Sequence, residues 1–244
     1  PLQGAESFSS WADAVSWQCA LHRTRVRMSD PQASAESGGT VAAQNEKEKK
    51  VEAFIKDHNV WLRLGKGGEE VALTTDGEEG DGYQGNFQWS PDRKKLIGFR
   101  HKKAQERIVH FVESSPKDQL QPKLHSNRYL KPGDQIAQTK PHLFDIVGKK
   151  EVPLDETLFA NPWNIGSYRW EKDSSRFTFY YNQRGHDVVR IVAIDAESGA
   201  VTALIDDPSQ TFVNYSNYNH RSLLESTNEM IWMSERDGWN HLYL

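Results

Sequence analysis

Two stretches of the sequence, Trp-Ser-Pro-Asp-Arg-Lys-Lys-Leu-Ile-Gly-Phe at Trp89–Phe99 and Trp-Glu-Lys-Asp-Ser-Ser-Arg-Phe-Thr-Phe at Trp170–Phe179, repeat one pattern. Both read Trp-x-x-Asp-x-x-basic-apolar-x-apolar. Alternating apolar residues are typical of a half-buried β-strand, and an Asp just before them is typical of a polar turn. We therefore predict a buried Trp, a turn closed by Asp and a strand in each copy. A third, eroded copy is expected over 216–232, with its turn at Asn228 and Glu229.

A second pattern, a strand followed by a polar turn and another strand, recurs over 54–62, 180–191 and 232–243. The runs are short and rich in Val, Ile, Phe, Tyr and Trp, which suit a pleated, half-buried surface. Glycine-containing segments at 65–68 and 195–199 are typical of hairpin turns. We expect strands over Val51–Lys56, Val60–Leu64, Glu70–Leu73, Lys95–Arg100, Arg107–Val112, His142–Ile146, Arg176–Tyr181, Val188–Ile194, Val201–Ile205, Met230–Met233 and His241–Leu244.

These patterns predict an all-β fold, a partial β-propeller of four-stranded antiparallel blades. A sandwich does not need a recurring Trp-x-x-Asp corner, whereas a propeller repeats a four-stranded meander. The two Trp-led copies lie 81 residues apart, which exceeds one blade of about 40–50 residues. Residues 114–141, with four prolines and few branched apolar residues, hold the excess and are expected to form an excursion or a broken blade edge.

The domain organisation follows from this interpretation. Residues 51–244 are expected to form the partial propeller, with about three to four blades. Residues 1–50 differ in composition, with a Ser-, Ala- and Gly-rich stretch followed by a mixed charge run. We expect a poorly ordered or atypical N-terminal segment there, with a short helix over Ser10–Leu21.

Composition excludes several classes of function. The 244 residues carry 30 Lys and Arg against 34 Asp and Glu, a formal charge of −4, which argues against a nucleic-acid surface because that requires a basic face. The only cysteine, Cys19, cannot form an intrachain disulfide or a multi-cysteine zinc site. No His-Glu-x-x-His pair or acidic calcium loop occurs, so we expect neither metal nor cofactor. No apolar stretch approaches the ~18 residues of a membrane span.

The ends of the sequence suggest a piece of a longer protein. The chain begins at Pro1 without an initiator Met, and Leu244 falls inside an expected strand. We interpret the chain as a fragment or a processed piece, in which a missing signal peptide carries no information about the compartment.

Several segments resemble one known family. Ser-Glu-Arg-Asp-Gly-Trp-Asn-His-Leu-Tyr at Ser234–Tyr243 resembles a signature of the propeller domain in dipeptidyl peptidase IV-like proteins of the prolyl oligopeptidase group. The segments Phe54–Leu62, Leu73–Gly77, Trp89–Asp92 and Tyr129–Asp134 resemble the same family in the same order. The resemblance covers about residues 50–244.

The resemblance implies an eight-bladed propeller followed by an α/β-hydrolase domain. Members of the family are serine peptidases that release dipeptides from peptide N-termini, and they prefer proline or alanine in the second position. The family also implies an extracytoplasmic location and a possible homodimer. A serine nucleophile there needs a Gly-x-Ser-x-Gly elbow, which this sequence lacks. We therefore expect the non-catalytic propeller portion, which gates and orients peptide substrates for a hydrolase domain beyond Leu244.

The resemblance also implies a substrate-binding pair, Glu78 and Glu79. Exopeptidases of the family hold the free amino terminus of the substrate with two adjacent propeller glutamates, and carboxylates suit an ammonium group with its three donors. Glu78 and Glu79 lie ten to eleven residues before Trp89, about where the family's pair lies. The family's pair sits in an aromatic helical turn, however, whereas residues 76–82 read Asp-Gly-Glu-Glu-Gly-Asp-Gly. A solvated acidic turn is therefore the alternative.

Other interpretations stay open at this point. The family brings aromatic residues toward the substrate cavity near Phe212 and Tyr215, but ordinary blade packing explains these residues equally well. A catalytically inactive propeller that acts as a protein–protein interaction scaffold is the competing function, because a fold does not fix a function. A truncated propeller with an open, aggregation-prone edge is a third possibility.

Overall fold

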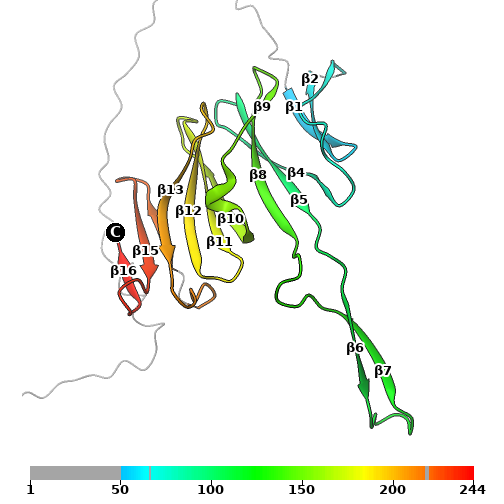
Figure 1. Cartoon of the computed structure of the whole chain (residues 1–244). Coiled ribbons are helices and arrows are strands. Elements are labelled where there is room, and N and C mark those ends of the chain that lie inside the picture. Colours follow the sequence, from blue (N-terminus) through cyan, green and yellow to red (C-terminus); the bar gives the residue numbers. More distant parts are fainter. Residues whose placement is uncertain (1–50, 66, 218–219) are drawn as a thin grey trace, which may run out of the picture. The chain divides into compact units, whose positions relative to one another are not determined.

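The computed structural model describes residues 51–65, 67–217 and 220–244 (Figure 1). The expectations for residues 1–50, including a helix over Ser10–Leu21, lie outside the described residues. The strands are β1 Val51–Lys56, β2 Asn59–Leu64, β3 Glu70–Ala72, β4 Asp81–Trp89, β5 Lys95–Lys102, β6 Ile108–Glu113, β7 Lys123–Arg128, β8 Gln138–Asp145, β9 Lys150–Val152, β10 Pro162–Trp170, β11 Arg176–Gln183, β12 Val188–Asp195, β13 Val201–Pro208, β14 Arg221–Leu224, β15 Glu229–Ser234 and β16 His241–Tyr243. A 3-10 helix, η2, spans Glu156–Phe159.

The strands pair in chain order. Within the described residues, β4–β5–β8–β9 and β10–β11–β12–β13 are four-stranded sheets, β1–β2–β3 and β14–β15–β16 are three-stranded, and β6–β7 form a separate pair. Every pairing is antiparallel (Figure 1). Meanders of this kind are the blades of a propeller, so the predicted all-β fold with four-stranded antiparallel blades is confirmed.

The first strands of the two four-stranded sheets, β4 and β10, were not predicted from the sequence. Both β4 and β10 contain glycine and amide residues, and β10 begins with Pro162. These residue types are depleted in strands, which weakens the sequence signal. The remaining unexpected strands are β7, β9 and β14. Residues 138–141 belong to β8, because they complete its ladder with β5.

In both Trp-x-x-Asp segments the Asp closes a turn, as predicted, but the Trp is less buried than predicted. Asp92 accepts hydrogen bonds from the hydroxyl of Ser90 at 2.7 Å and from the amide of Lys94 at 3.1 Å, and Asp173 closes the equivalent turn. The predicted burial of Trp89 and Trp170 is wrong, since both are half-buried. Each indole packs against a buried cluster, and the Trp170 Nε1 donates to a backbone oxygen of the neighbouring sheet at 3.1 Å.

Successive sheets bury their faces against one another. Strands β5 and β11 alternate, so that one set of side chains faces the preceding sheet and the other the following sheet. Between the two four-stranded sheets the buried cluster combines Ile97 and Phe99 of β5 with Phe177 and Phe179 of β11. A second cluster, around Leu96, joins the sheet β1–β2–β3 to the sheet that follows it. The turns add a direct link, since the Asp92 amide donates to the hydroxyl of Ser174 at 3.1 Å.

The first strands of both four-stranded sheets are irregular at matching places. The repeat extends upstream as Gly-Asn-Phe-Gln-Trp over 85–89 and Gly-Ser-Tyr-Arg-Trp over 166–170. The ladder register shifts between Gln84 and Gln88 in β4 and between Gly166 and Arg169 in β10. A further shift in β10 leaves Trp163 as an extra residue. Such bulges re-aim side chains and are common beside binding sites.

Candidate functional site

The turn between β3 and β4 carries the expected glutamates. Glu78 and Asp81 form an isolated antiparallel bridge, with their amides and carbonyl oxygens paired at 3.0 and 3.1 Å. Glu78 and Glu79 are both exposed at the outside of this turn. The Gly80 that follows has a φ of +91°, which a residue with a Cβ seldom adopts. The backbone is thus bent so that two adjacent carboxylates face solvent.

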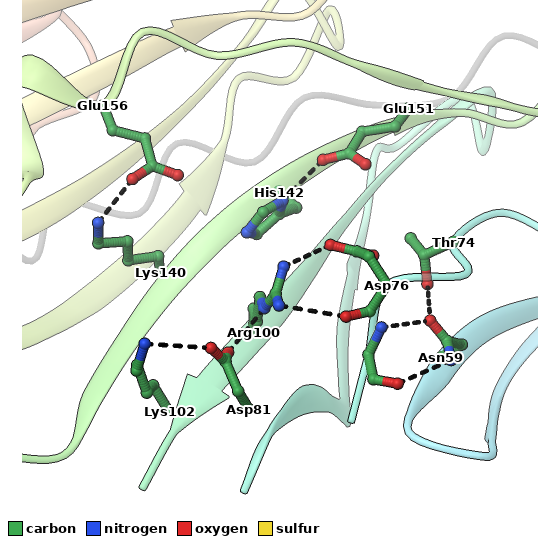
Figure 2. A network of polar contacts seen from close by, with 11 residues as sticks. Asn59, Thr74, Asp76, Asp81, Arg100, Lys102, Lys140, His142, Glu151 and Glu156 are labelled. Atoms are coloured by element: carbon green, nitrogen blue, oxygen red, sulfur yellow. Dashed lines mark hydrogen bonds and ion pairs between the residues drawn. The ribbon is translucent and has the colours of Figure 1, made fainter. Parts of the chain in front are cut away.

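Contacts to the β1–β2 turn hold this segment in place. Figure 2 shows Asn59 accepting from the Gly77 amide at 2.8 Å and from the Thr74 hydroxyl at 3.0 Å. A Cβ on Gly77 would lie 2.2 Å from the carbonyl oxygen of His58, so only glycine fits there. The Tyr83 amide donates to the same oxygen at 2.9 Å. These bonds join two sheets and fix both ends of the turn.

Arg100 of β5 forms ion pairs with two of the four acidic residues of this segment. Its Nε donates to Asp81 at 2.7 Å, and its Nη1 pairs with Asp76 (Figure 2). Glu78 and Glu79 form no side-chain hydrogen bond or ion pair with any residue that the structure describes. The guanidinium thus pairs with the two aspartates, and the two glutamates have no cationic partner among the described residues.

The electrostatics of the anchor agree with this division. Burial of Asp81 opposes its ionisation, but the hydrogen bond and charge of Arg100 outweigh it and hold the pKa of Asp81 below its ordinary value. Lys102, 3.4 Å from the same carboxylate, adds to the effect. Burial also raises the pKa of the Tyr83 hydroxyl, over whose ring the Arg100 guanidinium lies at 5.8 Å. Asp81 is therefore a fixed anion at neutral pH.

A cleft of about 240 Å³ adjoins the anchor, lined by side chains of β4, β5 and β8 and by one residue of η2. Two of its side chains have acidic partners: Lys140 pairs with Glu156 at 2.6 Å, and the His142 Nδ1 lies 2.7 Å from Glu151 (Figure 2). The cleft is therefore polar, and the Lys and Arg side chains that line it already lie beside carboxylates.

Phe212 and Tyr215 join an aromatic cluster around His186, which lies in the β11–β12 turn. Tyr215 stacks on the His186 ring with centroids 4.2 Å apart, and Phe212 meets it edge-on at 5.6 Å. Trp163 of β10 also meets the His186 ring edge-on, with centroids 5.0 Å apart. Burial lowers the pKa of His186, so the ring is neutral at pH 7. The cluster is partly open, since Trp163 and Phe212 are each 49% exposed.

A sequence model of one family, the dipeptidyl peptidase IV (DPP IV) N-terminal region, matches residues 12–244. The chain belongs to this family. Its solved structural neighbours include dipeptidyl peptidase 4 from Porphyromonas gingivalis, with a TM-score of 0.55 and 17% identity over 80% of this chain and 29% of that one. A Bacteroides ovatus chain named as a dipeptidyl aminopeptidase IV matches with a TM-score of 0.49 and 19% identity, over 78% of this chain and 27% of that one.

The DPP IV N-terminal region described here is thus a minor part of such proteins. This chain spans about 29% of the Porphyromonas protein's length. At this identity the likeness establishes the fold, and the fold alone does not carry an activity.

In this DPP IV N-terminal region, the Glu78–Asp81 turn and the cluster around His186 lie at corresponding ends of two neighbouring sheets. In a four-stranded antiparallel meander, the turn between the second and third strands lies at the same end as the start of the first strand. The Glu78–Asp81 turn precedes β4, and the cluster around His186 lies beside the start of β10. The Gln138 amide bonds to Asn161 at 2.8 Å and ties these two ends together.

Sequence reasoning missed the residues that define this surface. The role of Arg100 depends on contacts 19 and 24 positions away, and the exposure of Trp163 depends on a bulge. For Arg100, the one signal in the sequence was a charged residue in an otherwise apolar expected strand. Within 51–65, 67–217 and 220–244, no three His, Cys, Asp or Glu side chains gather to hold a metal ion, and no helix has the length and apolarity of a membrane span.

Proposed function

We propose that this chain is the non-catalytic propeller portion of a DPP IV-like serine exopeptidase. Its role is to wall the active site and to orient peptides for release of an N-terminal dipeptide. The bond-breaking step, acyl transfer by a serine with a histidine base, belongs to a hydrolase domain elsewhere in the full-length protein. Membership of the DPP IV N-terminal family supports this role.

One observation carries the proposal: Glu78 and Glu79 are adjacent, exposed carboxyl residues on an anchored turn, and neither has a cation partner among the described residues. The aspartates beside them are occupied by Arg100. An ammonium group offers three donors and gains charge-assisted hydrogen bonds from two carboxylates. The free amino terminus of a peptide therefore fits the pair, and a blocked amino terminus does not.

Replacing Glu78 or Glu79 by Gln in the full-length protein tests the amine site. Each substitution keeps the shape and removes one charge, so we expect KM for a Gly-Pro chromogenic substrate to rise about tenfold or more, since hydrogen bonds to charged groups contribute about 1.5–3 kcal/mol. Glu229→Gln, at an exposed strand residue of another sheet, is the matched control. Unchanged KM in both variants would reject the amine site.

A specific observation favours protein binding as a second function. The hairpin β6–β7 pairs with no other strand among the described residues, and its apolar side chains are open. Ile108, Val112 and Leu124 share one face of the hairpin and are 54%, 61% and 66% exposed. Exposed apolar groups gathered on one surface mark an interaction site. The partner that we propose is a second copy of this chain.

The oligomeric state measures this second function. Replacing Val112 and Leu124 together by Ser removes the apolar pair of the hairpin, and we expect light scattering to show the dimer of the full-length protein shifting to monomer. A wild-type monomer, or a variant that stays dimeric, would reject the hairpin as the interface. Peptidase activity of the variant separates this outcome from the amine site.

A further inference from the structure

A second cavity, of about 340 Å³, lies between the first strands of the two four-stranded sheets. It is lined by β4 through Gln84 and Asn86, and by β10 through four consecutive residues from Pro162 to Ile165. Its volume is within the range of small-ligand sites. The mechanism proposed above makes no use of it.

The chemistry of this cavity differs from that of the acidic turn. The described residues that line it include no Lys, Arg, Asp or Glu. Its polar groups include the side-chain amides of Gln84, Asn86 and Asn164 and a His101–Thr139 pair joined at 2.9 Å. An amide offers both donor and acceptor atoms, as a peptide group does. The cavity therefore suits a neutral ligand and is a poor site for a free amine, a carboxylate or a phosphate.

Trp163 gives the cavity an aromatic wall because β10 is bulged there. Pro162 and Asn164 face consecutive residues of β11, so Trp163 is the extra residue between them. The bulge turns the indole outward and leaves it 49% exposed, although burial is the usual state of so large an apolar ring. Bulges that re-aim a side chain in this way are common at binding sites.

The backbone of β10 adds a row of hydrogen-bonding groups. Among the described strands, β10 pairs only with β11, so its other edge has no strand partner. An unpaired edge accepts an extended chain through backbone hydrogen bonds. A peptide matches the spacing of this row with its own N–H and C=O groups, whereas a sugar chain has no such regular repeat, so the edge favours a peptide over an oligosaccharide.

We propose that this cavity binds the backbone of an extended peptide downstream of its first residues, with Trp163 and Asn164 as the specificity-determining contacts. This inference rests on the proposed function in one respect, that the peptide is the substrate held at Glu78–Glu79. Gln84 follows Glu79 by five residues, which limits their separation to about 18 Å. An extended peptide covers that distance with about five or six residues. Substrates of that length or longer reach both sites.

Binding of a blocked peptide tests the cavity apart from the amine site. An N-acetylated, C-amidated fluorescent octapeptide has no free amine and resists an exopeptidase, and its Kd for the full-length protein is measured by anisotropy. We expect Trp163→Ala and Asn164→Ala to weaken binding about fivefold or more, and Trp163→Phe to restore most of it. Trp239→Ala, at a Trp that is 76% exposed in the β15–β16 turn, is the matched control and stays within about twofold.

The outcomes separate the two proposals. No binding of the octapeptide by the wild type, or equal binding by Trp163→Ala, overturns the cavity site. Binding of a labelled glucose hexasaccharide that requires Trp163, in place of the peptide, overturns it too. Glu78→Gln leaves octapeptide binding unchanged. In kinetics, Trp163→Ala lowers kcat/KM for an unblocked octapeptide and spares a dipeptide chromogenic substrate, whereas Glu78→Gln impairs both.

Discussion

The sheets β4–β5–β8–β9 and β10–β11–β12–β13 share one repeat but connect their second and third strands differently. In the latter, four residues from Arg184 to Asp187 join β11 to β12. In the former, residues 103–137 run between β5 and β8 and include the β6–β7 hairpin. The ladders themselves are alike, since β5 pairs with β8 over eight positions and β11 with β12 over seven, both without a register shift.

The structure of a blade depends on its ladder and its buried faces and not on the connection between its second and third strands. The hydrogen-bonded ladder and the buried faces are the same in kind with and without the insertion, so the connection is free to vary. Backbone bonds close the base of the insertion, from Gln105 to Gln135 at 3.1 Å and from Lys103 to Gly80 at 2.7 Å. The sheet therefore ends at a defined boundary, and what lies beyond it contributes to surface contacts more than to stability.

The largest expected effect concerns the core between the two sheets. Phe179 is 1% exposed and packs edge-on against Phe159 at 5.5 Å, while the repeat places Gly98 at the same position in the other sheet. Phe179→Ala leaves a cavity, and we expect the free energy of unfolding in urea to fall by about 3–5 kcal/mol. Phe111→Ala on the hairpin, where the ring is 50% exposed, is the control. A loss below about 1 kcal/mol for Phe179→Ala would show that the two sheets do not share a core.

The alternation that defines these strands was visible in the sequence. In Phe177–Tyr181, as in Lys95–Arg100, a short run rich in apolar and aromatic residues follows a turn, which is typical of a strand buried on both faces. The first strands were not visible, because Gly85 and Gly166 stand where a β-branched residue would have signalled a strand. Their bulges reflect packing between sheets, which no local pattern reports.

The candidate site, too, was only partly predictable from the sequence. The adjacency of Glu78 and Glu79 is a property of the sequence. Their lack of a cation partner among the described residues could not be read from the sequence. It depends on Arg100 of β5, which forms ion pairs with the neighbouring Asp76 and Asp81 instead. That pairing is a tertiary contact between charges, and its geometry cannot be obtained from spacing along the chain.

A smaller effect is expected at the ion pair that distinguishes the start of β4. Asp81 and Arg100 pair there, whereas the repeat places Pro162 and Tyr181 at the same positions of the other sheet. The folded-state pKa of Asp81 lies below its ordinary value of 3.8. Its contribution to stability is therefore complete above that value and is lost as the pH falls through the folded-state pKa.

Asp81→Asn measures this contribution. We expect it to lower the free energy of unfolding by about 1–3 kcal/mol at pH 7, and the difference from wild type to shrink as the pH drops below about 4. Asp118→Asn on the hairpin, where the carboxylate is 63% exposed beside Lys123, should cost at most a few tenths of a kcal/mol at pH 7. A difference for Asp81→Asn that stays constant from pH 7 to pH 3 would contradict the charge-based explanation.

The smallest effect on stability is expected from removing the insertion itself. Replacing residues 107–129 by Gly-Ser brings the β5–β8 connection closer in length to that of the other sheet and retains the closing bond at Gln105. The hairpin buries little apolar surface, as the exposure of Ile108, Phe111 and Val112 shows, so folding loses little transfer free energy with it. We expect the free energy of unfolding to change by less than about 1 kcal/mol. If β6–β7 forms the interface between two copies, the same deletion yields a monomer, so urea unfolding and light scattering on one variant report separately on the blade and on its insertion. Unfolding at a much lower urea concentration would mean instead that the insertion supports the β5–β8 ladder and that the two sheets differ in more than their connection.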